Sequence, residues 1–315
     1  MRIIDAEKNS LHLSKNTAVG LGTFDGLHIG HIALVNTLVS EAKLNNLHSL
    51  LYTFVKHPCN ILRKKLFPDI LTPINKKAEL LSGTSLDYLY CEKFDEVYSR
   101  IQPEQFVKDI LVDRLAMRLA VVGFNYRFGY KGMGDAELLK KLGKKFDYSV
   151  TVIPPIKVDN EIVSSTLIRK YVIKGKMSRV FKMLGRHYSI KGTVIDGKKI
   201  GNTIGFPTAN IHPENYMVTP GEGVYITKTY IDNMLYDSIT NIRQKSVFYL
   251  DDCKYKNQSI VETYIFDLDR MLYGKELEVY FIEKIRDEKN FESLNELKIQ
   301  IEKDIKIARS FQLRK

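Results

Sequence analysis

The first half of the chain alternates between two patterns of apolar residues. Residues 17–21 form a short apolar run that ends at Gly22, and apolar residues at helical spacing follow over residues 34–42. A helical pattern also covers residues 103–117. Further short apolar runs, each typical of a buried strand, are residues 49–54, 87–94, 119–124 and 149–155. This alternation predicts a Rossmann-like α/β domain, in which helices cover a parallel sheet.

After about residue 183 the pattern changes to short β-rich runs that are separated by Gly, Asn and Asp turns. These runs are residues 188–196, 224–231, 246–250, 260–268 and 277–285. Their spacing predicts a small antiparallel β-barrel or sandwich. The amphipathic and charged stretch over residues 291–311 predicts a terminal helix that closes the second domain. We therefore expect two domains, residues 1–182 and residues 183–315.

Composition narrows the class of protein. The 315 residues suffice for two domains, and a hydrophobic content of 44% suffices for a core in each. Because no apolar run approaches the ~18 residues of a membrane span and the charged start lacks a signal-peptide segment, we expect a cytoplasmic protein without a membrane partner. Cys59, Cys91 and Cys253 stand far apart, so we expect reduced thiols and no disulfide or zinc site.

The formal net charge is +11, which could attract nucleic acid or small phosphates. The lysines are spread along the chain, however, and the densest groups, residues 140–145 and residues 63–65, are short. We therefore expect a solvated basic surface with no nucleic-acid partner, on a monomer or weak homo-oligomer. A functional anion-binding patch is the alternative.

The stretch GTFDGLHIGH, residues 22–31, lies between a predicted strand and a predicted helix. Open α/β sheets bind ligands there, and a helix start offers free N–H groups and the positive end of a dipole to a phosphate. His28 and His31 are three residues apart, so both can donate to phosphate oxygens as charge builds during transfer. The alternative is a glycine-rich turn with surface histidines. The position between strand and helix favours phosphate binding.

These residues resemble the adenylylation motif of the bacterial bifunctional riboflavin kinase/FAD synthetase family. Four further segments resemble the family: TFVKHP (53–58), LTPINKK (71–77), GFNYRFG (123–129) and SSTLIR (164–169). Within GFNYRFG, Tyr126 stands where that family usually has Phe. The segment SSTLIR resembles the helix start with which nucleotidyltransferases grip a triphosphate, where Ser165 and Thr166 can contact phosphate and Arg169 adds a cation. Taken alone, Ser-Ser-Thr is an ordinary helix cap.

The resemblance implies an FMN adenylyltransferase domain with three sets of functional residues. The catalytic residues would be His28 and His31. The nucleotide would contact Gly22, Thr23, Phe24, Asp25, Gly30, Asn125, Ser164, Ser165, Thr166 and Arg169. The flavin ring would lie between Phe54 and Phe128.

One class of aminoacyl-tRNA synthetases combines HIGH with a KMSKS loop, and residues 176–180 read KMSRV. We expect KMSRV to be the surface of a helix over residues 166–184. The phosphate-gripping role already falls to residues 164–169, and no anticodon-reading domain is evident.

The second half contains GNTIGFPTANI, residues 201–211, which resembles the riboflavin kinase signature. The Thr208 hydroxyl and the Asn210 side-chain carbonyl would face the same side of an extended segment. Such oxygen ligands suit Mg²⁺, which bridges ATP phosphates. Gly197, Gly201 and Gly205 would let a loop fold over those phosphates. The alternative is a Pro-Thr turn between two strands.

The family pattern also implies a base for the riboflavin 5′-hydroxyl and a flavin contact in this half. Glu262 would be the base, although a single strand Glu is commonly a solvated residue. Arg286 would lie near the flavin. Arg243 stands where the family usually has Gly, Ser246-Val247 replace Pro-Thr, and Asn202 stands where Arg is common. Our hypothesis is that these departures weaken or alter the kinase and leave adenylylation intact.

The residues and the resemblance together predict a two-step enzyme that makes FMN and then FAD from riboflavin and ATP, with Mg²⁺. An adenylyltransferase whose kinase-like domain is weak or inactive and serves in flavin binding or regulation is the nearest alternative. Two other classes stay open: a nucleotidyltransferase or synthetase-like enzyme with another acceptor, and a flavin- or RNA-binding regulator with a degraded barrel.

Overall fold

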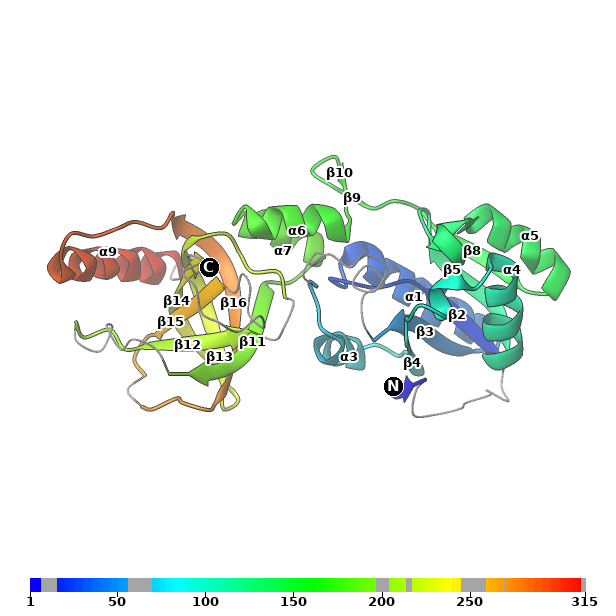
Figure 1. Ribbon diagram of the computed structural model, residues 1–315, viewed down its shortest axis with the longest axis horizontal. Coiled ribbons are helices and arrows are strands. Elements are labelled where there is room, and N and C mark those ends of the chain that lie inside the picture. Colours follow the sequence, from blue (N-terminus) through cyan, green and yellow to red (C-terminus); the bar gives the residue numbers. More distant parts are fainter. Residues whose placement is uncertain are drawn as a thin grey trace. The chain divides into compact units, whose positions relative to one another are not determined.

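The chain forms two compact units, Met1–Ser165 and Thr166–Lys315, each with its own sheet (Figure 1). The computed structural model describes residues 1–6, 16–55, 70–196, 204–213, 217–244, 259–268 and 270–312. None of the helices in these ranges is both long enough and apolar enough to cross a membrane.

The first unit is built on a six-stranded sheet with the strand order β1-β4-β3-β2-β5-β8. All neighbouring strands are parallel. The strands are β1 (Arg2–Asp5), β2 (Thr17–Leu21), β3 (His48–Phe54), β4 (Tyr88–Glu92), β5 (Met117–Gly123) and β8 (Ser149–Ile153). From β2 the chain builds outward to β3 and β4 and then crosses to β5 on the other side. The carboxyl ends of β2 and β5 therefore form the topological switch point, where such sheets bind ligands.

Helices cover both faces of this sheet, as predicted (Figure 1). One face packs against α1 (Ile29–Leu44) and α3 (Ile74–Ser82). The other packs against α5 (Ala136–Phe146) and the segment of α4 (Pro103–Gln105) with the π-helical η2 (Phe106–Arg114). Short elements complete the unit: η1 (Tyr98–Arg100), β6 (Arg127–Phe128), η3 (Tyr130–Gly132), β7 (Gly134–Asp135), β9 (Lys157–Val158) and β10 (Glu161–Ile162).

The second unit contains a closed antiparallel barrel, which decides between the predicted barrel and sandwich. Its strands are joined in the order β11-β12-β15-β14-β13-β16. They are β11 (Tyr188–Ile195), β12 (Thr208–Pro213), β13 (Gly223–Ile231), β14 (Met234–Gln244), β15 (Ser259–Ile265) and β16 (Glu276–Arg286). The predicted terminal helix is α9 (Leu294–Gln312), whose Ala308 is buried against apolar residues of the barrel strands. The predicted strand over residues 246–250 lies outside the described residues.

Two helices, α6 (Ser165–Ile173) and α7 (Met177–Leu184), replace the single helix predicted over residues 166–184. Gly175 separates them with φ = +67°, a conformation that ends a right-handed helix. A Cβ at this position would lie 2.7 Å from the Tyr225 hydroxyl oxygen. KMSRV therefore spans a helix break and the start of α7, not the middle of one helix. The structure groups residues 166–182 with the second unit.

Candidate functional site

The loop between β2 and α1 contains most of the GTFDGLHIGH residues, and its backbone departs from ordinary geometry. Phe24 has φ = 49° and Leu27 has φ = 38°, although neither is a glycine. Bulky residues rarely adopt positive φ, and such backbone persists only where the surroundings fix it. Both side chains are buried, Phe24 to 1% and Leu27 to 0% exposure. The loop is therefore held in one conformation at the carboxyl end of β2.

His28 and His31 meet at the start of α1. His28 caps the helix, with its Nδ1 accepting a hydrogen bond from the His31 backbone N–H at 3.2 Å. The two imidazole rings stack with centroids 3.6 Å apart. A Cβ at Gly30 would stand 3.2 Å from the His28 ring, so a glycine there leaves room for the stack. Because Nδ1 accepts this hydrogen bond, a neutral His28 carries its own proton on Nε2 and can donate a hydrogen bond from there.

Phe24 and Asp25 have side chains that build the loop. The Phe24 ring packs against His31 with centroids 5.2 Å apart. The buried Asp25 carboxylate accepts hydrogen bonds from the backbone N–H groups of Leu71, at 2.9 and 3.2 Å, and Thr72, at 3.0 Å. These contacts tie the segment that follows residue 70 to the histidine loop. The predicted contact of Phe24 and Asp25 with the nucleotide stays a prediction.

Lys77 was missing from the predicted site residues, although it closes the LTPINKK segment. It lies on α3, is 5% exposed, and donates through Nζ to the Thr23 carbonyl at 2.8 Å and the Thr53 hydroxyl at 3.1 Å. Burial lowers the pKa of Lys77 to about 8, against the attraction of Asp25. The spacing of four between Lys77 and the buried Leu81 was the sequence signal that this lysine faces inward.

The structure brings the start of the SSTLIR segment to the histidine loop. The Ser165 hydroxyl donates to the Asp25 carbonyl at 2.9 Å, across 140 positions of sequence. Ser164, which precedes Ser165 in the sequence, is half-buried. Thr166, which is exposed, and Arg169, which is half-buried, follow on α6 and belong to the second unit. Their predicted contacts with the nucleotide stay predictions.

Asn125 lies in the turn that follows β5, on the other side of the switch point. This turn is closed by a hydrogen bond from the Tyr126 N–H to the Gly123 carbonyl at 3.1 Å. Asn125 and its neighbour Phe124 are exposed. Because β2 and β5 are adjacent parallel strands, the Asn125 turn and the half-buried Gly22 and Thr23 lie at the same edge of the sheet.

The two predicted flavin contacts of this unit lie in one aromatic cluster. Phe54, at the end of β3, is half-buried and packs edge-on against Phe94 and Tyr98, with centroids 5.3 and 5.5 Å apart. Phe128 is 5% exposed and stacks on Tyr126 with centroids 5.7 Å apart. Both rings belong to or pack against the same hydrophobic core. Phe54 therefore presents more accessible ring surface than Phe128.

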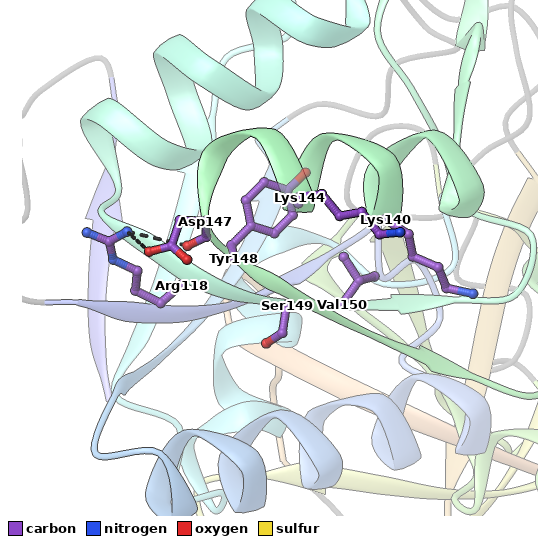
Figure 2. A pocket seen from close by; sticks show the side chains of 8 residues that line it. Arg118, Lys140, Lys144, Asp147, Tyr148, Ser149 and Val150 are labelled. Atoms are coloured by element: carbon purple, nitrogen blue, oxygen red, sulfur yellow. Dashed lines mark hydrogen bonds and ion pairs between the residues drawn. The ribbon is translucent and has the colours of Figure 1, made fainter.

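A hollow of about 630 Å³ lies elsewhere on the first unit (Figure 2). It is lined by Arg118, Lys140, Gly143, Lys144, Asp147, Tyr148, Ser149 and Val150. Figure 2 shows Arg118 turned toward Asp147, and the ion pair between them spans 3.6 Å. Ser149 begins β8, so the hollow lies toward the amino ends of the strands, away from the histidine loop. None of the predicted site residues lines it.

In the barrel, the predicted kinase residues lie on neighbouring strands. Thr208 and Asn210 alternate with the buried Ala209 and Ile211 along β12, so both side chains face outward. Asn210 is the cross-strand partner of Glu262 on β15. The candidate metal ligands and the candidate base therefore share one outer face. Gly197, Gly201, Asn202, Ser246 and Val247 lie outside the described residues.

Two arginines of the barrel form ion pairs with carboxylates. Arg243 donates through Nη2 to Glu262 Oε2 at 2.5 Å. Arg286 donates through Nε and Nη2 to the buried Asp304 of α9, at 2.9 to 3.2 Å. The Arg286 pair fastens α9 to β16, which shows a structural use for this side chain. Its predicted contact with flavin stays a prediction.

The fold and sites define a nucleotidyltransferase-like α/β domain joined to a closed antiparallel barrel. Residues 11–167 match the family model of FAD synthetase, and residues 184–312 match that of riboflavin kinase. Relatives that are at least 30% identical extend over nearly the whole chain. The chain belongs to the family of bifunctional riboflavin kinase/FMN adenylyltransferases.

Three comparisons illustrate this similarity. The bifunctional riboflavin kinase/FMN adenylyltransferase of Buchnera aphidicola subsp. Schizaphis graminum is 36% identical over 99% of both chains. Its counterpart in Bacillus subtilis is 33% identical over 91% of this chain and 90% of its own. A crystal structure described as a macrolide-efflux protein from Streptococcus pneumoniae has a TM-score of 0.86 and 27% identity, with 98% of each chain covered.

Proposed function

We propose that this chain phosphorylates riboflavin to FMN in its barrel and adenylylates FMN to FAD in its α/β unit, with release of pyrophosphate. The observation that supports the proposal best is the switch-point edge of the parallel sheet. There, His28 at the cap of α1, Ser165 and the Asn125 turn lie around the carboxyl ends of β2 and β5. The relatives named above carry both activities in their names.

In the adenylylation step, an oxygen of the FMN phosphate would bond to the α-phosphorus of ATP. The bond between that phosphorus and the bridging oxygen would break, and pyrophosphate would leave. His28 would donate its Nε2 proton as a hydrogen bond to the phosphate oxygens, and His31 would act beside it. The positive end of the α1 helix dipole adds positive potential at the same point. Stabilisation of the transferring phosphoryl charge is the main task of such a site.

In the kinase step, the riboflavin 5′-hydroxyl oxygen would bond to the γ-phosphorus of ATP while ADP leaves. Glu262 would accept the hydroxyl proton. Mg²⁺ fits the donors on this face, because Thr208 is exposed, Asn210 is half-buried, and both offer oxygen atoms beside a carboxylate. Thr208 and Asn210 would hold the ion, which would supply positive charge to neutralise the phosphates when bound.

The test supplies riboflavin and Mg·ATP to the purified protein and separates the products by chromatography. FMN followed by FAD is the expected result. Appearance of neither product would contradict the proposal. Conversion of added FMN to FAD without conversion of riboflavin would support the alternative, an adenylyltransferase with an inactive kinase-like barrel. One observation favours that alternative: Arg243 already holds an oxygen of the candidate base.

A further inference from the structure

Glu262 lies at the centre of a polar row on the outer face of the barrel. Its register partners are Asn210 on β12 and Asn241 on β14. The Glu262 side chain is 22% exposed, so it is partly shielded from water. Arg243 follows Asn241 by two positions on β14 and therefore presents its side chain on the same face. The candidate base thus has a cation within reach before any substrate is bound.

Arg243 is shared between two carboxylates. Its Nη2 lies 2.5 Å from Glu262 Oε2, and its Nε lies 3.8 Å from Glu288 Oε1. Asn241 also donates to Glu288 Oε1, at 3.5 Å, so Glu288 belongs to the same cluster. Hydrogen bonds between a guanidinium and a carboxylate are among the stronger ones in proteins. The pair with Glu262 is the shorter of the two ion pairs and engages an oxygen that a base needs.

The backbone accommodates Arg243 without strain. Arg243 pairs with Ile260 in the regular ladder between β14 and β15, and it is not among the described residues with positive φ. An arginine in place of the glycine usual in the family therefore acts through its side chain. The side chain is 44% exposed, so the guanidinium can leave the carboxylate for another anion without crossing the core.

We propose that Arg243 is a positioning residue that holds the Glu262 carboxylate in the substrate-free barrel, and that FMN formation requires this ion pair to open. The inference rests on the proposed role of Glu262 as the base. Once the pair is open, Glu262 Oε2 accepts the 5′-hydroxyl proton while the hydroxyl oxygen bonds to the γ-phosphorus and ADP leaves.

The first test compares Arg243→Gly with wild type in FMN formation at saturating riboflavin and Mg·ATP. Removal of the restraint should raise kcat roughly twofold to fivefold, the scale of one partly exposed ion pair. Arg270→Gly is the matched control, because Arg270 is 40% exposed in its own ion pair, with Asp232, away from Glu262. That control should turn over at the wild-type rate. Conversion of FMN to FAD by each protein should stay unchanged.

A second test separates restraint from a merely structural role. Glu288 competes with Glu262 for the guanidinium, so Glu288→Gln should leave Arg243 to Glu262 alone and lower FMN formation. In an Arg243→Gly background the same Glu288→Gln change should have no effect, because the shared cation is gone. A structural role would instead make both single variants slower and less stable.

The outcomes are distinguishable. FMN formation by Arg243→Gly at or below the wild-type rate, with wild type active, overturns the role of Arg243 and leaves the proposed function in place. Absence of FMN with wild type and every variant overturns the proposed kinase function, and the role of Arg243 with it. A faster Arg243→Gly variant together with a slower Glu288→Gln variant supports the restraint.

Discussion

At the residue scale, the environment of His28 decides what its ring can do. The backbone N–H of His31 occupies Nδ1, so the neutral ring keeps its proton on Nε2. The ring is 6% exposed and stacked on His31, which limits its rotation. A fixed donor costs no reorganisation when phosphate charge develops. The sequence motif indicated the two histidines, and the structure adds which nitrogen donates.

His28→Ala should therefore lower FAD formation from FMN by at least ~100-fold, the scale of losing one transition-state donor. FMN formation from riboflavin should continue at the wild-type rate, because the barrel residues are untouched. Both rates come from chromatography of one purified variant. His48→Ala, at the start of β3, serves as the control and should retain both activities. Equal loss of both activities in His28→Ala would argue against separate sites.

Lys77 gives stability a measurable dependence on pH. Its pKa is about 8 in the folded chain and 10.5 as the ordinary value, so between these pH values the unfolded chain binds a proton that the folded chain lacks. The free energy of unfolding should therefore rise with pH in this window. Relative to Lys77→Met, wild type should gain about 2 kcal/mol between about pH 8 and about pH 10. Denaturant titrations of both proteins measure this difference, and parallel curves would contradict the burial of a titrating lysine.

Other residue-scale contacts were beyond sequence reasoning. The Asp25 carboxylate binds backbone 46 and 47 positions away, and Arg286 binds Asp304 of α9. A pattern of residue types indicates that Asp25 and Arg286 belong to the family motifs. It contains no distances, so it does not show which partner the fold brings to each side chain.

At the element scale, periodicity predicted the parallel sheet well and the barrel less completely. Strands β2, β3 and β5 are largely apolar and buried because helices cover both faces of the sheet. Strand β14 was missed because the buried barrel interior there contains Ser238 and Thr240 in place of apolar residues. These hydroxyls bond to Thr227 at 2.8 and 2.9 Å, which satisfies them without water. Because polar residues occupy these buried positions, the sequence of β14 lacks the alternation of apolar and polar residues that predicts a strand.

The break between α6 and α7 leads to a stability prediction. Gly175→Ala should cost at least ~2 kcal/mol, because φ is positive there and a Cβ would meet Tyr225 at 2.7 Å and Lys284 at 2.9 Å. Gly274→Ala is the matched control, since its φ is +74° but nothing lies within 4 Å of its Cβ position. That change should cost about 1 kcal/mol. Thermal unfolding of the two variants measures the difference, and equal losses would show that the Tyr225 contact adds nothing.

At the scale of the whole molecule, the candidate catalytic and metal-binding residues of the two reactions lie in different compact units. The histidines belong to Met1–Ser165, and Thr208, Asn210 and Glu262 belong to Thr166–Lys315. FMN is the product of one proposed reaction and a substrate of the other. If FMN is released between the steps, the two activities can be supplied by different molecules.

A mixture of His28→Ala and Glu262→Gln proteins should therefore convert riboflavin to FAD, although neither variant does so alone. Glu262→Gln should make FAD from added FMN, and His28→Ala should stop at FMN. Chromatography of the three reactions checks the prediction. If the mixture fails while each variant keeps its remaining activity, FMN does not pass freely from one molecule to another.

The central claim is that the switch-point edge of the parallel sheet joins AMP from ATP to FMN. Its most direct test incubates the wild-type chain with FMN and Mg·ATP and measures FAD and pyrophosphate in the same samples. The account predicts that the two products appear in equal amounts, at a rate that Glu262→Gln does not change. ATP consumption without FAD, or FAD formation that depends on Glu262, would contradict it.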